Sequence, residues 1–260
     1  MSERLDRRDF LERAALVAGT VGIVPRWALA GSSDPRLKEL ARSIQGRVVA
    51  PGESGYRAAR ILYNPRFDGI RPRAVVLAES STDVGKAILW ARKYSIPLTP
   101  RSGGHSYGGY STTTGVVVDV TRINAVTVDS AKMTATVGAG ARLIDVYSKL
   151  WAHGFGIPAG SCPTVGIGGH ALGGGVGFAS RRLGTTTDNV LAVRIVTADG
   201  RVLDCDAHHH ADLFWACRGG GRGNFGIATS FRFKVHPVGN VSYFTIGWPW
   251  AMAPAVIQAW

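Results

Sequence analysis

The chain has 260 residues, a formal net charge of +12 and 34 glycines. This length suits one large domain or two small ones, and 45% hydrophobic with 18% charged residues excludes a disordered chain. The basic residues are scattered, without the stripe interleaved with aromatics that nucleic-acid binding favours, so no nucleic-acid partner is expected. The cysteines, Cys162, Cys205 and Cys217, make an odd count without CxxC spacing, which argues against a disulfide framework and a zinc site, and no metal is expected.

The first thirty residues have the parts of an export signal. Arg7 and Arg8 precede an apolar stretch at residues 14–24, which ends near an A-x-A site at 28–30. The stretch is much shorter than the roughly 20 residues that span a bilayer, so no membrane anchor is expected after signal removal. The Arg-Arg pair followed by Phe-Leu resembles a twin-arginine signal, which implies export to the periplasm or beyond. An ordinary Sec signal and an amphipathic N-terminal helix are the alternatives.

Apolar patterns predict a mixture of helices and strands in the rest of the chain. Residues 74–78 predict a short strand, and Ser81 begins the cap of a helix that runs to about Tyr94. The later predicted elements are strands at 115–120, 134–137 and 227–235, helices at 142–152 and 211–216, and a hairpin of 190–196 with 201–203. Because helices and strands do not alternate strictly, the predicted fold class is α+β.

Glycine is the unusual component of the sequence. Average usage near 7% would give roughly 18 glycines. Of the 34 present, 24 lie between Gly103 and Gly226, a region with three glycine-rich loops at residues 100–109, 160–175 and 218–226. Backbone without Cβ atoms can approach a ligand closely, and successive N–H groups bind pyrophosphate and carbonyl oxygens. The loops therefore predict a large, flat, phosphate-bearing ligand that lies along the main chain.

Two common glycine motifs occur in these loops by pattern alone. Residues 104–108 match the hydrolase pattern G-x-S-x-G, but the residues that follow are a poor helix start. Residues 166–171 fit a loose dinucleotide-binding pattern. Asp188 follows at about the sequence spacing at which that pattern has the acidic residue that contacts the ribose. Pro163 and the glycines at 173–175 would disrupt the strand-to-helix turn that a Rossmann site needs. Neither an acyl hydrolase nor a nicotinamide site is expected.

Three motifs, which arrive in order, carry a resemblance to a known family. They are RSGGHS at residues 101–106, CPTVGIGGH at 162–170 and NFGI at 224–227. Together they resemble the berberine-bridge-enzyme-like flavin oxidases of the vanillyl-alcohol-oxidase and p-cresol-methylhydroxylase superfamily. The resemblance covers roughly residues 35–250. It implies a two-subdomain FAD-binding domain of the p-cresol-methylhydroxylase type, with the start of an α+β substrate domain.

The export-signal pattern and the family resemblance together imply a division of the chain into four parts. These are a signal peptide at residues 1–30, an N-terminal helical lead-in at 31–66, the FAD-binding domain at 67–238 and, at 239–260, the first strand and helix of a truncated substrate domain. The family's catalytic base lies in that substrate domain. It is therefore expected beyond residue 260.

Individual roles follow from the resemblance. FAD would be bound bicovalently, with His105 joining the flavin 8α-methyl group and Cys162 joining C6. His170 would stabilise negative charge at the pyrimidine edge of the flavin, and Val165 occupies the family's oxygen-gate position, where valine resembles the oxidase pattern. The residues expected to bind the cofactor are Pro100, Arg101, Ser102, Gly103, Gly104, His105, Ser106, Cys162, Gly166, Ile167, Gly168, Gly169, His170, Val176, Gly221 and Ile227.

The implied activity is that of an exported FAD-dependent oxidoreductase. A substrate C–H or alcohol would give a hydride to FAD, and O2 would be the acceptor that yields H2O2. The expected partners are a small-molecule substrate and O2. The alternative is a flavin-binding fragment that lacks turnover because its substrate domain is missing. Outside the site, Cys205 and Cys217 are predicted to lie in the core, and the run at residues 208–210 is predicted to be exposed.

Overall fold

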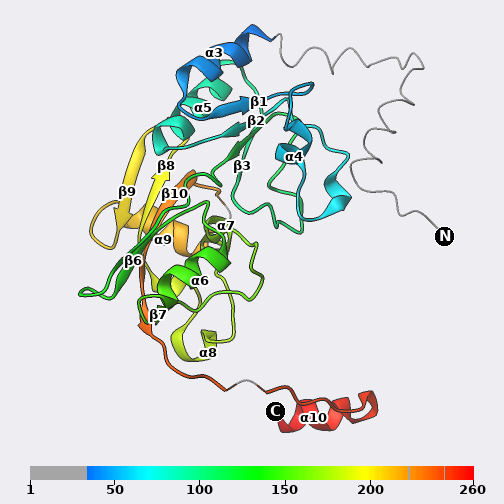
Figure 1. Cartoon of the computed structure of the whole chain (residues 1–260), viewed down its shortest axis with the longest axis vertical. Helices are drawn as coiled ribbons and strands as arrows, with labels where there is room; N and C mark the ends of the chain where they lie inside the picture. The colour runs from blue at the N-terminus through cyan, green and yellow to red at the C-terminus, as the bar shows by residue number, and fades with distance from the viewer. Residues whose placement is uncertain (1–33, 222, 243) are drawn as a thin grey trace, which may run out of the picture.

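The computed structural model describes residues 34–221, 223–242 and 244–260, so the expected export signal at 1–30 lies outside the described residues. The described chain folds into two main sheets with helices around them, shown in Figure 1. This arrangement confirms the predicted α+β class with two subdomains. Within the described residues, no helix is both long enough and apolar enough to cross a bilayer.

The first sheet has four strands in the order β1-β2-β4-β3. Strands β2 (Ala74–Leu77) and β3 (Leu98–Arg101) both pair parallel with β4 (Val116–Asp119), which lies between them, and β3 is at the edge. Strand β1 (Arg47–Val49) pairs antiparallel with β2. The valines of β2 and β4 are fully buried, as expected for a parallel sheet covered on both faces.

Helix α5 (Ser81–Lys93) connects β2 to β3, and its N-terminus joins the lead-in to the sheet. The cap is Ser80, one residue earlier than expected, whose hydroxyl accepts a hydrogen bond from the Asp83 amide. The buried Asp83 carboxylate accepts three further backbone N–H bonds of 2.9–3.0 Å, from Gln45, Gly46 and Glu79. One side chain thereby fixes the turn before β1 against the start of α5.

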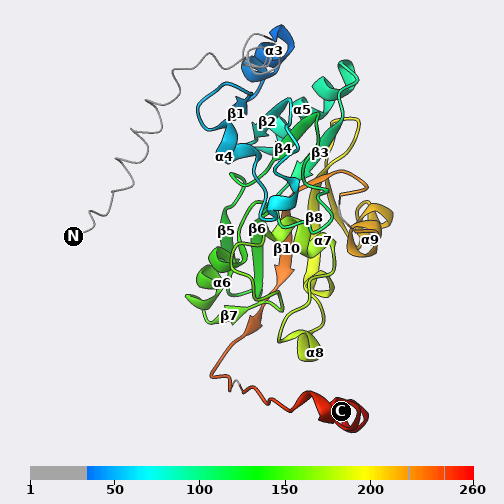
Figure 2. The same ribbon diagram turned by 90° about the vertical axis from the view of Figure 1, so that its right-hand side faces the viewer.

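The second sheet has five antiparallel strands in the order β5-β6-β10-β8-β9 (Figure 2). The strands are β5 (Val126–Asp129), β6 (Thr134–Gly138), β10 (Ile227–Lys234), β8 (Val190–Val196) and β9 (Val202–Asp206). The predicted hairpin is confirmed as the β8-β9 pair. Strand β5 was not predicted, because it lies at an edge where no residue is fully buried and its apolar pattern is short.

The predicted helices around the second sheet are confirmed. Helix α6 (Leu143–Trp151) buries Leu143, Val146 and Leu150. Helix α9 (Ala211–Gly219) buries Phe214 and Cys217. Cys205 is buried too, which confirms the expected core position of both cysteines, and residues 208–210 are exposed as predicted.

The two ends of the described chain differ from the sequence-based expectation. The lead-in contains helices α3 (Pro35–Ser43) and α4 (Tyr56–Arg60), but it also supplies strand β1, so it is not only helical. At the other end, residues 239–242 and 244–249 form no strand, and the 3-10 helix η3 (Trp250–Met252) and helix α10 (Ala253–Ala259) follow. Helix α10 lies apart from both sheets in Figures 1 and 2.

Candidate functional site

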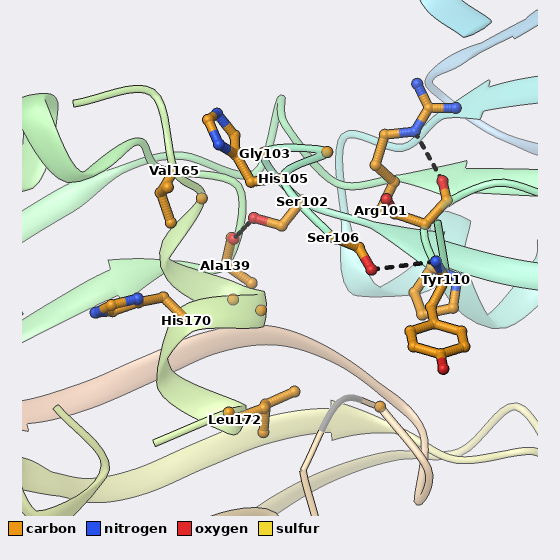
Figure 3. A pocket seen from close by; sticks show the side chains of 18 of the residues that line it. Arg101, Ser102, Gly103, His105, Ser106, Tyr110, Ala139, Val165, His170 and Leu172 are labelled. Atoms are coloured by element: carbon orange, nitrogen blue, oxygen red, sulfur yellow. Dashed lines mark hydrogen bonds between the residues drawn. The ribbon is translucent and has the colours of Figure 1, made fainter. Parts of the chain in front are cut away.

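A cavity of about 530 Å³ lies where the two sheets meet (Figure 3). It is bordered by the carboxyl end of β3, the loop that follows it, the 162–176 segment and the start of β10. Binding at the carboxyl ends of parallel strands is the general rule for open sheets. The expected site residues that line it are Pro100, Arg101, Ser102, Gly103, Gly104, His105, Ser106, Cys162, Gly166, Gly168, Gly169, His170, Val176 and Ile227.

Two expected site residues do not line the cavity. Ile167 is fully buried in the hydrophobic core, because its side chain points from the short helix α7 (Ile167–Leu172) into the interior. Gly221 has a left-handed φ of 65°, and a Cβ there would lie 3.7 Å from the carbonyl oxygen of Leu172, which does line the cavity. The Ile167 side chain thus packs in the core, and a cofactor contact of either residue stays a prediction.

The first loop presents a run of backbone donors to the cavity. Among the described residues, the N–H groups of residues 103–107 donate to no other group, and all five residues line the cavity. Gly104 has a left-handed φ of 70°. Successive amides with this change of hand form a concave nest that binds anions. The loop thus has a row of free N–H donors of the kind that bind anions.

The first and second loops pack backbone against backbone. A Cβ on Gly168 would lie 2.7 Å from the carbonyl oxygen of Ala139, which also accepts a 2.7 Å hydrogen bond from the Ser102 hydroxyl. Helix α7 was not predicted from its glycine-rich sequence. It is anchored by the Ile167 amide on the Ala141 carbonyl and by the Gly168 amide on Ala139. Tertiary hydrogen bonds therefore hold a helix that intrinsic propensity disfavours.

The His105 ring contacts two other side chains at the cavity, those of Tyr63 and Thr164. Its ring stacks on Tyr63, with ring centroids 4.1 Å apart and planes at 18°. Its Nε2 lies 2.9 Å from the Thr164 hydroxyl oxygen. Burial lowers the pKa of His105 below its ordinary value, so the imidazole is neutral near pH 7. Tyr63 was missed, because it lies outside every motif and only the fold brings it to His105.

Cys162 is a free cysteine, and its side chain is exposed at the same cavity. The residue sits in a turn closed by a 3.3 Å hydrogen bond from the Val165 amide to the Cys162 carbonyl. The structure thus brings together the histidine and the cysteine that the sequence singled out, although 56 positions separate them.

His170 is held in one tautomer. Its Nε2 accepts a 3.0 Å hydrogen bond from the Gly160 amide, so the neutral ring carries its proton on Nδ1. Burial lowers the pKa of His170, which favours this neutral form. Gly175, with a φ of 73°, packs so closely that a Cβ there would be 2.7 Å from the ring Nε2. The ring therefore offers Nδ1–H as its remaining donor.

A buried ion pair lies at the start of the first loop, where strand β3 ends. Arg101 Nη1 lies 3.7 Å from Asp119 Oδ2 across the parallel β3-β4 pair, and both side chains are buried. The same guanidinium donates to the carbonyls of Ala59 and Ser111. Burial lowers the pKa of Arg101 and raises that of Asp119, so desolvation outweighs their attraction. Within the described chain, Arg101 Nη2 has no partner.

Metal ligands do not gather at the site. No group of three or more histidine, cysteine, aspartate or glutamate side chains in the described ranges could hold a metal ion. His209 instead contacts the neighbouring Asp206, with 3.1 Å between Nδ1 and Oδ1. The cavity is thus lined by the backbone amides of residues 103–107 and by the side chains of His105, Cys162 and His170.

Comparison with known proteins agrees with this geometry. Residues 72–206 match the family model described as FAD binding domain. The uncharacterized FAD-linked oxidoreductase YvdP of Bacillus subtilis is 42% identical over 220 residues, which cover 84% of this chain and 49% of that protein. The solved structure of BBE-like 1 from Physcomitrella patens is 43% identical with a TM-score of 0.75, and the match covers 78% of this chain and 44% of that chain.

A third relative carries a flavin whose attachment its description states. Glucooligosaccharide oxidase from Acremonium strictum is described with a 6-S-cysteinyl, 8α-N1-histidyl FAD. It is 30% identical to this chain with a TM-score of 0.73, and the match covers 78% of this chain and 43% of that one. This chain thus spans about half the length of the relatives it matches.

Proposed function

Since this chain belongs to the FAD binding domain family that berberine-bridge-enzyme-like and other FAD-linked oxidoreductases share, we propose that it is an FAD-dependent oxidase of a small molecule. Bound FAD would supply a two-electron acceptor that takes a hydride from a substrate C–H bond, with O2 as the final acceptor and H2O2 as product. The observation that carries the proposal is the run of unpaired amides at residues 103–107, in the same cavity as His105 and Cys162.

The backbone of the first loop would hold the cofactor's pyrophosphate. Five N–H donors in series, one of them on the left-handed Gly104, match the charge and curvature of two bridged phosphates. Gly169 supports this fit, because a Cβ built there would meet no protein atom within 4 Å although the residue lines the cavity. The open space at that glycine is room for a ligand.

His105 and Cys162 would attach the cofactor covalently. Burial keeps His105 neutral, and in the tautomer whose Nε2–H donates to the Thr164 hydroxyl oxygen, Nδ1 would be the nucleophilic nitrogen. Cys162 is exposed to the cavity and free, as a thiol nucleophile must be. Cys162 would hold the flavin through an S–C bond in place of its own S–H bond and the ring C6–H bond, with O2 taking up both hydrogens as H2O2.

His170 would stabilise negative charge on the reduced cofactor. With Nε2 committed to the Gly160 amide, the ring presents Nδ1–H, a donor that can stabilise an anion without a proton transfer. Val165 also lines the cavity, and its small side chain supports access of O2. Because residues 1–30 resemble a twin-arginine signal, we also propose that the protein is exported with its cofactor in place.

The proposal is tested by offering the purified flavin-bearing chain a panel of alcohols and oligosaccharides while peroxide is measured. We expect at least one substrate to bleach the flavin absorbance without oxygen and to release H2O2 when oxygen is admitted. Slow reoxidation would contradict the role of O2 and of Val165. Bound flavin that no substrate reduces would favour the flavin-binding fragment without turnover.

A further inference from the structure

The segment that carries Cys162 makes three hydrogen bonds to helix α6. The first-turn amides of α6 donate to two carbonyls of this segment, Leu143 to Val165 at 2.9 Å and Ile144 to Pro163 at 3.1 Å. One turn further along, the Tyr147 hydroxyl donates a 2.7 Å hydrogen bond to the carbonyl of Gly160. The segment on both sides of Cys162 is thus tied to α6.

Gly160 is held at both of its backbone polar groups. Its carbonyl accepts from Tyr147, and its N–H donates to Nε2 of His170 at 3.0 Å. Cys162 follows two residues later and makes no side-chain hydrogen bond within the described residues. The position of its Sγ therefore depends on the hydrogen bonds that hold the neighbouring backbone. One of these bonds, to the Gly160 carbonyl, is donated by a side chain, that of Tyr147.

We propose that Tyr147 is a positioning residue that aims Cys162 at the cofactor, an inference that rests on the proposed FAD attachment. The tyrosine itself does not line the cofactor cavity. Its ring lies in a second, apolar recess with Trp151, Phe155 and Val238. It acts on Cys162 only through the Gly160 carbonyl. Removing the hydroxyl frees that carbonyl while the two helix amides still hold the far side of the segment.

The effect should be confined to one of the two covalent bonds. His105 is positioned by Tyr63 and Thr164, and the α6 amides hold the residues on both sides of Thr164 without the Tyr147 hydroxyl. A displacement of about 1 Å at a reacting atom can slow a reaction by up to ~100-fold. Loss of the Tyr147 hydrogen bond should therefore slow bond formation at Cys162 and leave bond formation at His105 unchanged.

The test compares Tyr147→Phe with Tyr56→Phe as a matched control. The Tyr56 hydroxyl also donates to a backbone carbonyl, that of Pro72, at 2.5 Å, but it lies under the first sheet away from the cavity. Each full-length variant is purified with its flavin at a fixed time after synthesis and digested. Mass spectrometry then gives the flavin-linked fraction of the His105 and Cys162 peptides.

We expect Tyr147→Phe to lower the rate of Cys162 linkage about tenfold or more, within the ~100-fold ceiling for a small misplacement, with the His105 linkage as in the wild type. Tyr56→Phe should leave both linkages intact. The His105 fraction in the same sample reports that the variant has folded. Equal Cys162 linkage in wild type and Tyr147→Phe, a parallel loss of both linkages, or a wild type linked only at His105 would each overturn the inference. A wild type without any flavin would instead refute the proposed function.

Discussion

Gly103 and Gly166 lie backbone against backbone, so that a Cβ on either residue would stand 2.2 Å from the amide nitrogen of the other. A Cβ on Gly166 would also meet the Ser102 hydroxyl oxygen at 2.0 Å. The two loops that carry His105 and Cys162 therefore meet at a contact that only glycine permits on both sides. This contact sets the spacing of the two candidate nucleophiles across the cavity.

Replacing Gly166 with alanine should destabilise the fold and separate the loops. Overpacking a close contact typically costs about 1–3 kcal/mol of unfolding free energy, to be measured by urea denaturation. Gly69→Ala is the control, because a Cβ there would meet no atom within 4 Å. Equal stability of the two variants would show that the loops are free to move apart.

Gly169→Ala should weaken cofactor binding while leaving the free energy of unfolding nearly unchanged. Its added methyl group meets no protein atom within 4 Å, so the unfolding free energy should stay within about 0.5 kcal/mol of wild type. The same methyl group projects at the cavity, and we expect roughly tenfold weaker FAD binding, which corresponds to ~1.4 kcal/mol. Titration of the flavin-free protein with FAD measures this. Unchanged affinity would place the cofactor away from helix α7.

Asp119→Asn should lower the free energy of unfolding more than a double replacement that removes both members of the Arg101–Asp119 ion pair. The single change leaves the buried Arg101 guanidinium without its counter-charge, which costs about 3–5 kcal/mol. Arg101→Met combined with Asp119→Leu removes both buried charges and should cost less than the single change. Urea midpoints of the two variants give the comparison. A milder effect of Asp119→Asn would mean that Arg101 draws its compensation from the carbonyls of Ala59 and Ser111.

Lowering the pH should reduce the free energy of unfolding of the wild type more than that of a His170→Gln variant. Burial lowers the folded-state pKa of His170 from the ordinary 6.5, so below that pH the unfolded chain binds more protons than the folded one. The contribution of His170 is therefore fully present above pH 6.5 and is lost as pH falls through the folded-state pKa. Unfolding free energies at about pH 7.5 and 5.5 should show the advantage of the wild type shrinking. The other titrating groups are common to both proteins, and a constant advantage would contradict the buried, neutral ring.

Continuous apolar runs made strands β2 and β4 predictable from the sequence, and caps and apolar spacing did the same for helices α5 and α6. Strand β3 escaped prediction, because it contains Pro100 and is only half-buried over most of its length. Helix α7 escaped because tertiary hydrogen bonds hold its glycines in place. For the site, motifs identified His105 and Cys162, but Tyr63 and Tyr147 act through contacts that exist only once the chain has folded.

The most direct measurement is the flavin content of the chain after denaturation. The purified protein is precipitated with acid, and the pellet and supernatant are examined for flavin absorbance. With FAD attached through His105 and Cys162, the wild-type pellet stays yellow, and a His105→Ala, Cys162→Ala variant releases all its flavin into the supernatant. A colourless wild-type pellet, or a double variant whose pellet keeps the flavin, would contradict the account.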